Sequence, residues 1–85
     1  MKLFYKVEPD KYSLCMKQIR ERFGMHEEID EARTTLMLEE EAPIERVSGT
    51  FDPSSDQMAQ VLVILNDKSL KEFFDSVLGT PYLVK

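Results

Sequence analysis

The sequence predicts a small α+β fold, an open-faced βαββαβ (ferredoxin-like) sandwich with two helices on one face of an antiparallel sheet. Two observations carry this prediction. Residues 2–8, 44–51 and 58–65 have the apolar patterns of strands, while residues 11–23 and 69–78 carry apolar stripes at helical spacing. Turn signals separate these segments. The chain of 85 residues is short, so we expect residues 1–85 to form a single domain.

The first strand and the first helix are indicated by clear periodicities. Residues 2–8 alternate, with Leu3, Tyr5 and Val7 pointing to one side. The helix over 11–23 has an apolar stripe within an arc of about 100°. That stripe consists of Tyr12, Cys15, Met16, Ile19 and Phe23. Asp10 is the predicted N-cap, and Gly24 is placed to end the helix in a left-handed conformation.

The second half of the chain predicts a hairpin, a helix and a short final strand. Residues 52–56, Asp-Pro-Ser-Ser-Asp, favour a turn between the strands 44–51 and 58–65. Ser69 and Glu72 match a capping box, which predicts Ser69 as the N-cap of the last helix. Its stripe consists of Leu70, Phe73, Phe74, Val77 and Leu78. Gly79 and Pro81 end it, and residues 82–85 add the short strand.

Residues 25–38 match two patterns and add either a short helix or a strand to this frame. Met25, Ile29, Ala32 and Leu36 share one helical face. The run of residues 34–38 has instead the β-branched character of a strand. The two patterns are nearly balanced, and we favour a helix that ends near Leu38.

The strand over 58–65 suggests self-association. In a βαββαβ sheet the first and third strands are central, and 2–8 and 58–65 are the most apolar strands. Residues 59–65 are apolar on both faces, although helices cover only one face of such a sheet. We expect Val61, Val63 and Leu65 to face either the 25–38 segment or a second copy in a homodimer.

Composition and charge exclude several classes of function. The net charge is −5, with six basic and three acidic residues in 1–25 but two basic and ten acidic residues in 26–56. We therefore expect no nucleic-acid partner, since phosphate binding needs a cationic stripe. No apolar run is long enough to span a bilayer or to act as a secretion signal, which predicts a soluble, cytoplasmic protein without a membrane partner. The single Cys15 cannot form an internal disulfide.

No motif in the sequence predicts catalysis, a cofactor or a metal. His26 stands beside Glu27, Glu28 and Asp30, but a zinc site needs three or four protein ligands at suitable spacing. Cys15 lies inside the apolar stripe of the first helix, where a cysteine acts as a small apolar side chain. The Asp52-x-Ser54-x-Asp56 pattern lacks the glycine and glutamate of a calcium loop. We expect no cofactor and assign no catalytic residue.

The resulting functional hypothesis is a non-catalytic protein-interaction or regulatory domain that binds a basic partner. Its acidic surface is the strongest feature of the charge pattern. The residues expected to contact the partner are Glu27, Glu28, Glu31, Glu39, Glu40, Glu41 and Glu45. The alternative is a dimeric regulatory module that senses a small ligand. A third hypothesis is a small enzyme that uses the acidic groups near His26.

Overall fold

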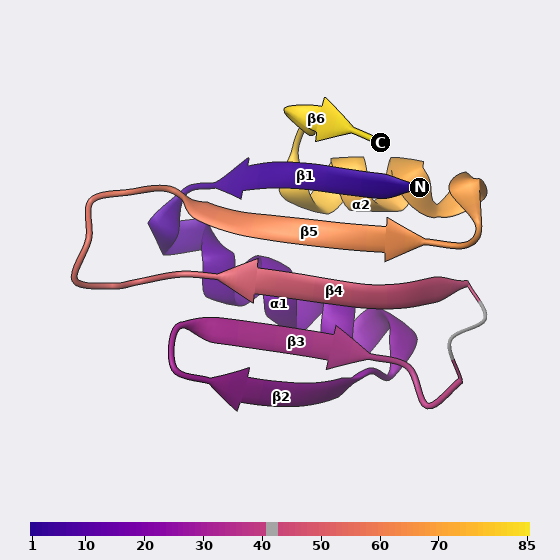
Figure 1. Ribbon diagram of the computed structural model, residues 1–85, viewed down its shortest axis with the longest axis horizontal. Coiled ribbons are helices and arrows are strands. Elements are labelled where there is room, and N and C mark those ends of the chain that lie inside the picture. The colour runs from indigo at the N-terminus through magenta and orange to yellow at the C-terminus, as the bar shows by residue number, and fades with distance from the viewer. Residues whose placement is uncertain (41–42) are drawn as a thin grey trace.

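The computed structural model describes residues 1–40 and 43–85, which form an α+β fold with two α-helices beside one antiparallel sheet (Figure 1). The elements in chain order are β1 (Lys2–Val7), α1 (Pro9–Phe23), β2 (His26–Asp30), β3 (Arg33–Met37), β4 (Ile44–Thr50), β5 (Ala59–Leu65), a 3-10 turn (Lys68–Leu70), α2 (Lys71–Leu78) and β6 (Leu83–Val84). The α+β class and the two helices are confirmed, and every strand pairing is antiparallel.

The sheet has six strands in the order β2-β3-β4-β5-β1-β6. The predicted βαββαβ topology is not confirmed, because an additional β2–β3 hairpin stands between α1 and β4. Both helices lie behind the sheet in Figure 1, so the face turned toward the viewer is open. The strands β1 and β5 pair with each other near the centre of the sheet, as expected from their apolar sequences.

The segment 25–38 forms a hairpin, so the expectation of a helix ending near Leu38 was wrong. The helical pattern joined residues that play different roles in the structure. Met25 and Leu36 are buried, but Ile29 is 68% exposed and Ala32 lies in the turn between β2 and β3. Glu31, the other residue of that turn, adopts a positive φ of 53°. Neither residue is the glycine or asparagine that usually marks such a turn.

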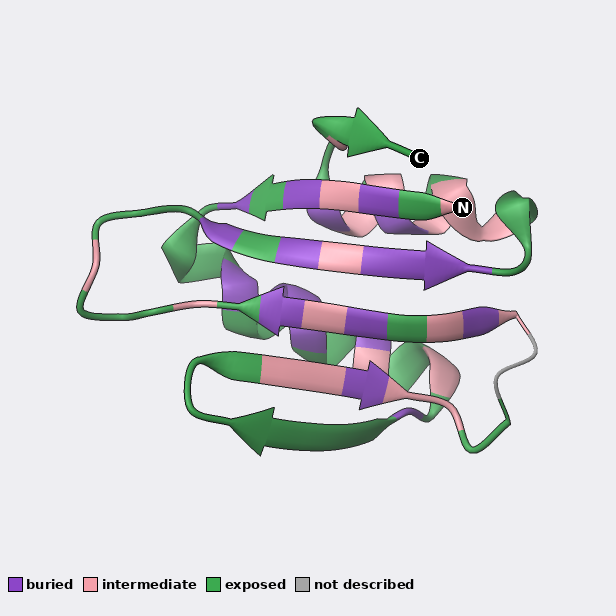
Figure 2. Ribbon diagram, in the orientation of Figure 1, coloured by how far each residue is buried: buried purple, intermediate pink, exposed green. Residues whose placement is uncertain are grey.

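The core lies between the sheet and the helices. Leu3, Tyr5 and Val7 of β1 face the helices and are buried, which confirms the predicted alternation (Figure 2). Val61, Val63 and Leu65 of β5 face the same way, with exposed fractions of 1%, 0% and 2%. These three side chains therefore pack beneath the chain's own helices. The expectation that they face the 25–38 segment or a second copy assigned them to the wrong side of the sheet.

Helix α1 begins and ends where proline and glycine allow. Pro9 occupies the first turn, where its missing N–H is tolerated. Glu8, not Asp10, is the N-cap residue and makes no side-chain capping hydrogen bond, so the prediction of Asp10 was wrong. Gly24 has φ 64° and ψ 43°, the predicted left-handed ending. Tyr12, Cys15, Met16 and Ile19 are buried as the stripe predicted.

The entry to α2 is capped by Asp67 rather than Ser69. One carboxylate oxygen of Asp67 accepts hydrogen bonds from the Ser69 amide at 3.0 Å and from the Ser69 hydroxyl at 2.7 Å. Both bonds lower the pKa of Asp67, and the bond from the Ser69 hydroxyl has the larger effect. Ser69 is thus a donor, and the predicted capping box with Glu72 does not form. The carboxylate caps the 3-10 turn that leads into α2.

An aromatic cluster joins the end of α1 to α2. Phe23 meets Phe73 edge-on at 5.2 Å between ring centroids, and it stacks on Phe74 at 5.8 Å. Arg22 lies over the rings of Phe23 and Phe73 at 5.3 and 5.9 Å. Phe74 is completely buried. Aromatic contacts of this kind add to the free energy of burying the rings, so the cluster holds the two helices side by side.

Helix α1 approaches the sheet closely at Gly49 on β4. A β-carbon at Gly49 would overlap the Tyr12 hydroxyl oxygen and would lie 2.8 and 2.9 Å from two of its ring carbons. The Tyr12 ring also packs on Phe51 at 5.2 Å. Its buried hydroxyl makes no hydrogen bond of ordinary geometry within residues 1–40 and 43–85. Burial raises the pKa of Tyr12, and the nearby Thr34 side chain lowers it by a smaller amount.

Helix α2 is fixed to β1 by one polar contact. The Tyr5 hydroxyl donates to Asp75 Oδ1 at 2.8 Å, and Lys71 Nζ donates to Oδ2 at 2.5 Å. Burial acts to raise the pKa of Asp75, but the hydrogen bonds from Lys71 and Tyr5 outweigh it and lower the pKa. Burial, followed by the contact with Asp75, raises the pKa of Tyr5 far above its ordinary value. Tyr5 is therefore a neutral donor at all ordinary pH values.

The Gly49 contact predicts a large effect from one added methyl group. Gly49→Ala should lower the free energy of unfolding by about 1–3 kcal/mol, since the new β-carbon overlaps the Tyr12 ring. Tyr12→Phe should leave stability unchanged or raised, because the hydroxyl that it removes is buried and unpaired. In the double variant the loss should be smaller than in Gly49→Ala alone. Urea unfolding measures all three.

Ser48→Ala is the matched control for Gly49→Ala, because Ser48 lies on the open face of the same strand. It should change stability by less than about 0.5 kcal/mol. Equal losses for Ser48→Ala and Gly49→Ala would contradict the close approach of Tyr12.

The Asp75 contact predicts a specific dependence of stability on pH. The pKa of Asp75 is lowered in the folded protein, so its stabilising effect is present at neutral pH and lost as the pH falls through that pKa. Asp75→Asn should therefore be less stable than the parent by on the order of 1 kcal/mol at pH 7, since charge-assisted bonds are weakened. The difference should shrink below about pH 4.

Urea melts of the parent and Asp75→Asn at several pH values measure this difference. Tyr5→Phe supplies the control, because it removes one of the two donors to the carboxylate. In that background the dependence on pH should be weaker. A difference that stays constant from pH 7 to pH 3 would contradict the role given to Asp75.

Candidate functional site

The most exposed strand of the sheet is β2, which forms one edge. All five of its residues, His-Glu-Glu-Ile-Asp, are exposed, and the strand is green along its whole length in Figure 2. It pairs with β3 on one side and with no strand of the described chain on the other. An edge strand presents unpaired backbone N–H and C=O groups at every second residue. The chain thus offers a free pairing edge that carries three carboxylates.

The two faces of β2 differ in chemistry. His26, Glu28 and Asp30 share the open face, because they pair with Met37, Thr35 and Arg33 of β3. Glu27 and Ile29 lie on the face that bears the helices. Glu27 Oε2 accepts from Arg20 of α1 at 3.1 Å, so this carboxylate already has a partner. Glu28 and Asp30 form no ion pair with any described residue.

The other predicted partner-binding residues do not form one patch with β2. Glu31 occupies the β2–β3 turn, while Glu39 and Glu40 follow the far end of β3, and all three are exposed. Glu45 is half-buried at an irregular step in the pairing of β4 with β5. Glu41 lies outside the described residues. The structure therefore separates the acidic set into the edge strand and the ends of its hairpin.

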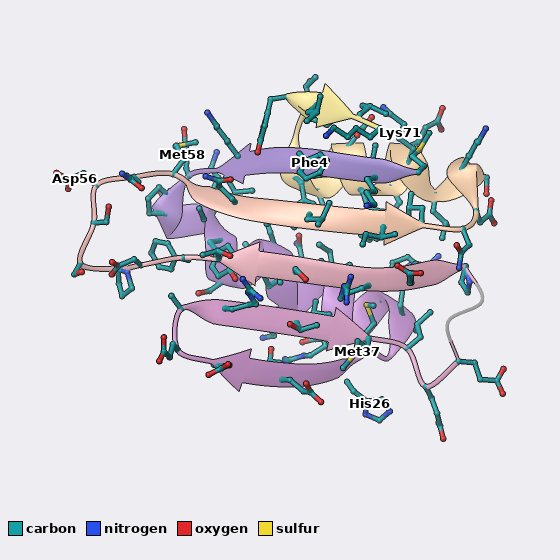
Figure 3. All side chains as sticks on the ribbon, viewed as in Figure 1. Phe4, His26, Met37, Asp56, Met58 and Lys71 are labelled. Carbon is teal, nitrogen blue, oxygen red and sulfur yellow. The ribbon has the colours of Figure 1, made fainter. Side chains whose placement is uncertain are left out.

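A second candidate site is a hollow of about 600 Å³ on the open face of the sheet. Its floor crosses β3, β4, β5 and β1, and Tyr82 adds to its wall. The lining residues are Phe4, Glu28, Arg33, Thr35, Met37, Arg46, Ser48, Thr50, Gln60, Val61, Leu62 and Tyr82. Figure 3 shows Phe4 on β1 and Met37 on β3, on opposite sides of this hollow.

The hollow combines basic, hydroxyl and aromatic groups. Arg33 and Arg46 form no ion pair with a described residue, although the chain as a whole is acidic. Phe4 and Tyr82 lie with ring centroids 6.3 Å apart. Lys6 Nζ lies 5.1 Å from the centre of the Tyr82 ring. The sequence alone does not reveal this site because its residues come from five strands and from Tyr82, and only the register of the sheet brings them together.

The residues considered for metal binding or catalysis, His26, Cys15 and Asp52, lie in separate parts of the structure. His26 is exposed on β2 beside Met37, and no cluster of three or more metal-ligating side chains occurs in residues 1–40 and 43–85 (Figure 3). Cys15 lies in the core as predicted, its thiol directed at the Val77 carbonyl at 3.4 Å, and burial raises its pKa. Asp52 accepts from the Ser54 hydroxyl at 2.6 Å and the Ser54 amide at 2.9 Å, which makes it a turn residue.

Self-association stays a prediction, but the residues predicted to mediate it are not available at the surface. Val61, Val63 and Leu65 are covered by the helices of the same chain, so they offer nothing to a second copy. The exposed large apolar residues nearest one another are Tyr82, Leu83 and Val84 at the β6 edge. Two copies could therefore meet only through surfaces other than the predicted one.

None of the described helices is long and apolar enough to cross a membrane. Comparison with protein families, with curated proteins and with solved structures gives no match for this chain.

The turn that positions the acidic edge makes a stability prediction. Glu31 has φ 53°, a conformation that is unfavourable for residues with a β-carbon. Glu31→Gly should raise the free energy of unfolding by about 0.5–1 kcal/mol, because the relief outweighs the greater freedom of glycine in the unfolded chain. Ala32→Gly is the matched control, since Ala32 has no positive φ, and it should destabilise. Thermal melts that order the two variants the other way would contradict the turn geometry.

Proposed function

We propose that this chain is a non-catalytic protein-interaction domain that binds an extended, basic segment of a partner protein along β2. The segment adds a strand to the edge of the sheet. Its backbone pairs with the free N–H and C=O groups of β2, and its basic side chains lie beside Glu28 and Asp30. The observation that carries the proposal is that β2 is a fully exposed edge strand whose open-face carboxylates form no ion pair with a described residue.

The two faces of β2 favour a particular partner sequence. Side chains of an added strand alternate between the two faces, as those of β2 do. Every second residue would lie beside Glu28 and Asp30, where Lys or Arg is favoured. The residues between them would lie beside Ile29, which is 68% exposed and would gain from apolar contact. The expected segment therefore alternates basic and apolar residues over about five positions.

Charge also opposes the pairing of β2 with itself. Two copies joined edge to edge would bring the carboxylates of both strands together, and like charges opposite each other are destabilising. Carboxylates on an edge protect it from aggregation. They leave it open to a basic strand, and such selectivity is what an interaction domain requires.

The chain order supports a role for the hairpin as an added functional part. Without β2 and β3, the order would be β-α-β-β-α-β, and the neighbours along the sheet would be β4-β5-β1-β6. We propose that this remainder is a ferredoxin-like frame with the β2–β3 hairpin inserted after α1. The frame buries the core, while β2 contributes no buried residue. The inner strand β3 contributes Leu36 to the core, so it is the outer strand β2 that is best explained by the surface that it presents.

A peptide alternating Lys and Val over eight residues, with blocked ends, tests the proposal. It should bind with an association rate that falls steeply as salt is added, since complementary charges act mainly on that rate. Glu28→Lys combined with Asp30→Lys should weaken binding at least about tenfold, because both charge pairs are lost and reversed. Surface plasmon resonance at low and physiological salt measures both effects.

Three controls separate strand addition from general electrostatic attraction. A peptide of the same composition with its Lys and Val in two blocks keeps the charge but loses the alternation, so it should bind more weakly. A third peptide, methylated on alternate backbone nitrogens, keeps the side chains but lacks the N–H donors on one of its edges. It cannot pair with β2 through that edge, so it should also bind more weakly. The variant with Glu39→Lys and Glu40→Lys changes the same number of charges beyond β3 and should bind nearly as the parent does. Equal affinity for all the peptides would contradict strand addition.

A further inference from the structure

We propose that the hollow on the open face binds a small phosphorylated ligand that carries a planar ring, such as a nucleoside monophosphate. This site shares only Glu28 with the acidic edge and takes a ligand of the opposite charge, so it does not depend on the function proposed above. Its volume of about 600 Å³ is in the range of small-molecule sites, roughly 300–1,000 Å³.

The β3–β4 part of the hollow is suited to an anion. Arg33 lies opposite Thr50, and Thr35 lies opposite Ser48, so these four side chains form two adjacent rows. Arg46 stands two residues before Ser48 on the same face of β4. The guanidinium groups supply hydrogen-bond donors in a planar arrangement that suits phosphate, and the hydroxyls can also donate. Neither guanidinium forms an ion pair with a described carboxylate, although Asp30 lies opposite Arg33 in register, so the donors of Arg46 in particular are free to meet a ligand.

The β5–β1 part is suited to a ring. Phe4 lies opposite Leu62, which lies opposite Ser48, so an apolar floor adjoins the hydroxyl groups in one row across the sheet. Tyr82 is 51% exposed and stands beside Phe4, with the two rings tilted by 47°. Its hydroxyl donates to Gln60 Oε1 at 3.3 Å, which holds the ring over this floor. A planar group placed here gains aromatic contact as well as apolar burial.

The spacing of the two parts sets the size of the ligand. Ser48 on β4 and Phe4 on β1 are separated by one strand, so their backbones lie about 10 Å apart. A ring joined to a phosphate by one sugar is of this order of length. The one carboxylate in the lining is Glu28, at the β2 end, and it opposes the binding of an anion. Removing its charge should therefore improve binding, whereas the same change weakens a basic peptide at β2.

Three probes separate the two parts of the site: adenosine monophosphate, adenosine and inorganic phosphate. We expect the monophosphate to bind more tightly than either fragment and to shift the backbone amide resonances of β3, β4, β5 and β1 in ¹⁵N-labelled protein. Arg46→Ala should weaken the monophosphate about tenfold or more and leave adenosine unchanged. Phe4→Ala should weaken the monophosphate and adenosine but not phosphate. Glu28→Gln should tighten the monophosphate.

Lys17→Ala is the control for loss of a positive charge, because Lys17 lies on α1 and pairs with Glu21. It should leave all three affinities unchanged. The proposal is overturned if the monophosphate binds no better than phosphate, if the shifted resonances lie outside this face, or if Lys17→Ala weakens binding as much as Arg46→Ala does. Much tighter binding of a single-stranded oligonucleotide, with the same residues affected, would also overturn it in favour of nucleic-acid binding.

Discussion

The packing of two helices against alternate side chains of β1 and β5 is the contact on which the remaining structure depends. It buries Leu3, Tyr5, Val61 and Val63 on one side of the sheet. Since the helices lie on that side, the residues between these positions point to the opposite, open face of the sheet. The close approach of Tyr12 to Gly49 and the hydrogen bond from Tyr5 to Asp75 then fix where each helix lies. The open face and both sheet edges remain for function.

Charge is distributed according to this one-sided packing. Glu28 and Asp30, which form no ion pair with a described residue, stand at the β2 edge, while Arg33, opposite Asp30 in register, and Arg46 line the hollow. The net charge of −5 does not show this separation, because the positions of the charged residues in the sequence do not show where they lie across the sheet. Two ligands of opposite sign are therefore compatible with one small domain. Glu28 belongs to both surfaces, and its charge has opposite effects on the two.

The strands and helices that build the core were predictable from the sequence, because burial on one side imposes a period of two or 3.6 residues. The hairpin was not. Its outer strand is covered on neither face, so no apolar alternation marks residues 26–30, and its turn contains Glu31 where glycine or asparagine is usual. For the same reason the sequence predicted an acidic surface but could not show which of its residues lie on the edge strand and which lie at the ends of the hairpin. The Asp67 cap was missed because Ser69, two residues on, satisfied the same pattern.

The double-sided apolar character of β5 has a local explanation. Alternation shows that Leu62 and Ile64 oppose Val61, Val63 and Leu65, but it cannot tell which set meets the helices. Ile64, on the open face, is only 8% exposed although no helix covers it. In register it lies between Arg46 of β4 and Lys2 of β1, and long basic side chains bury neighbouring apolar surface beneath their methylene groups. Ile64 is thus shielded within one chain. An apolar strand in this sheet therefore does not require a second copy of the protein, and the Leu62 side chain beside it remains available as the floor of the hollow.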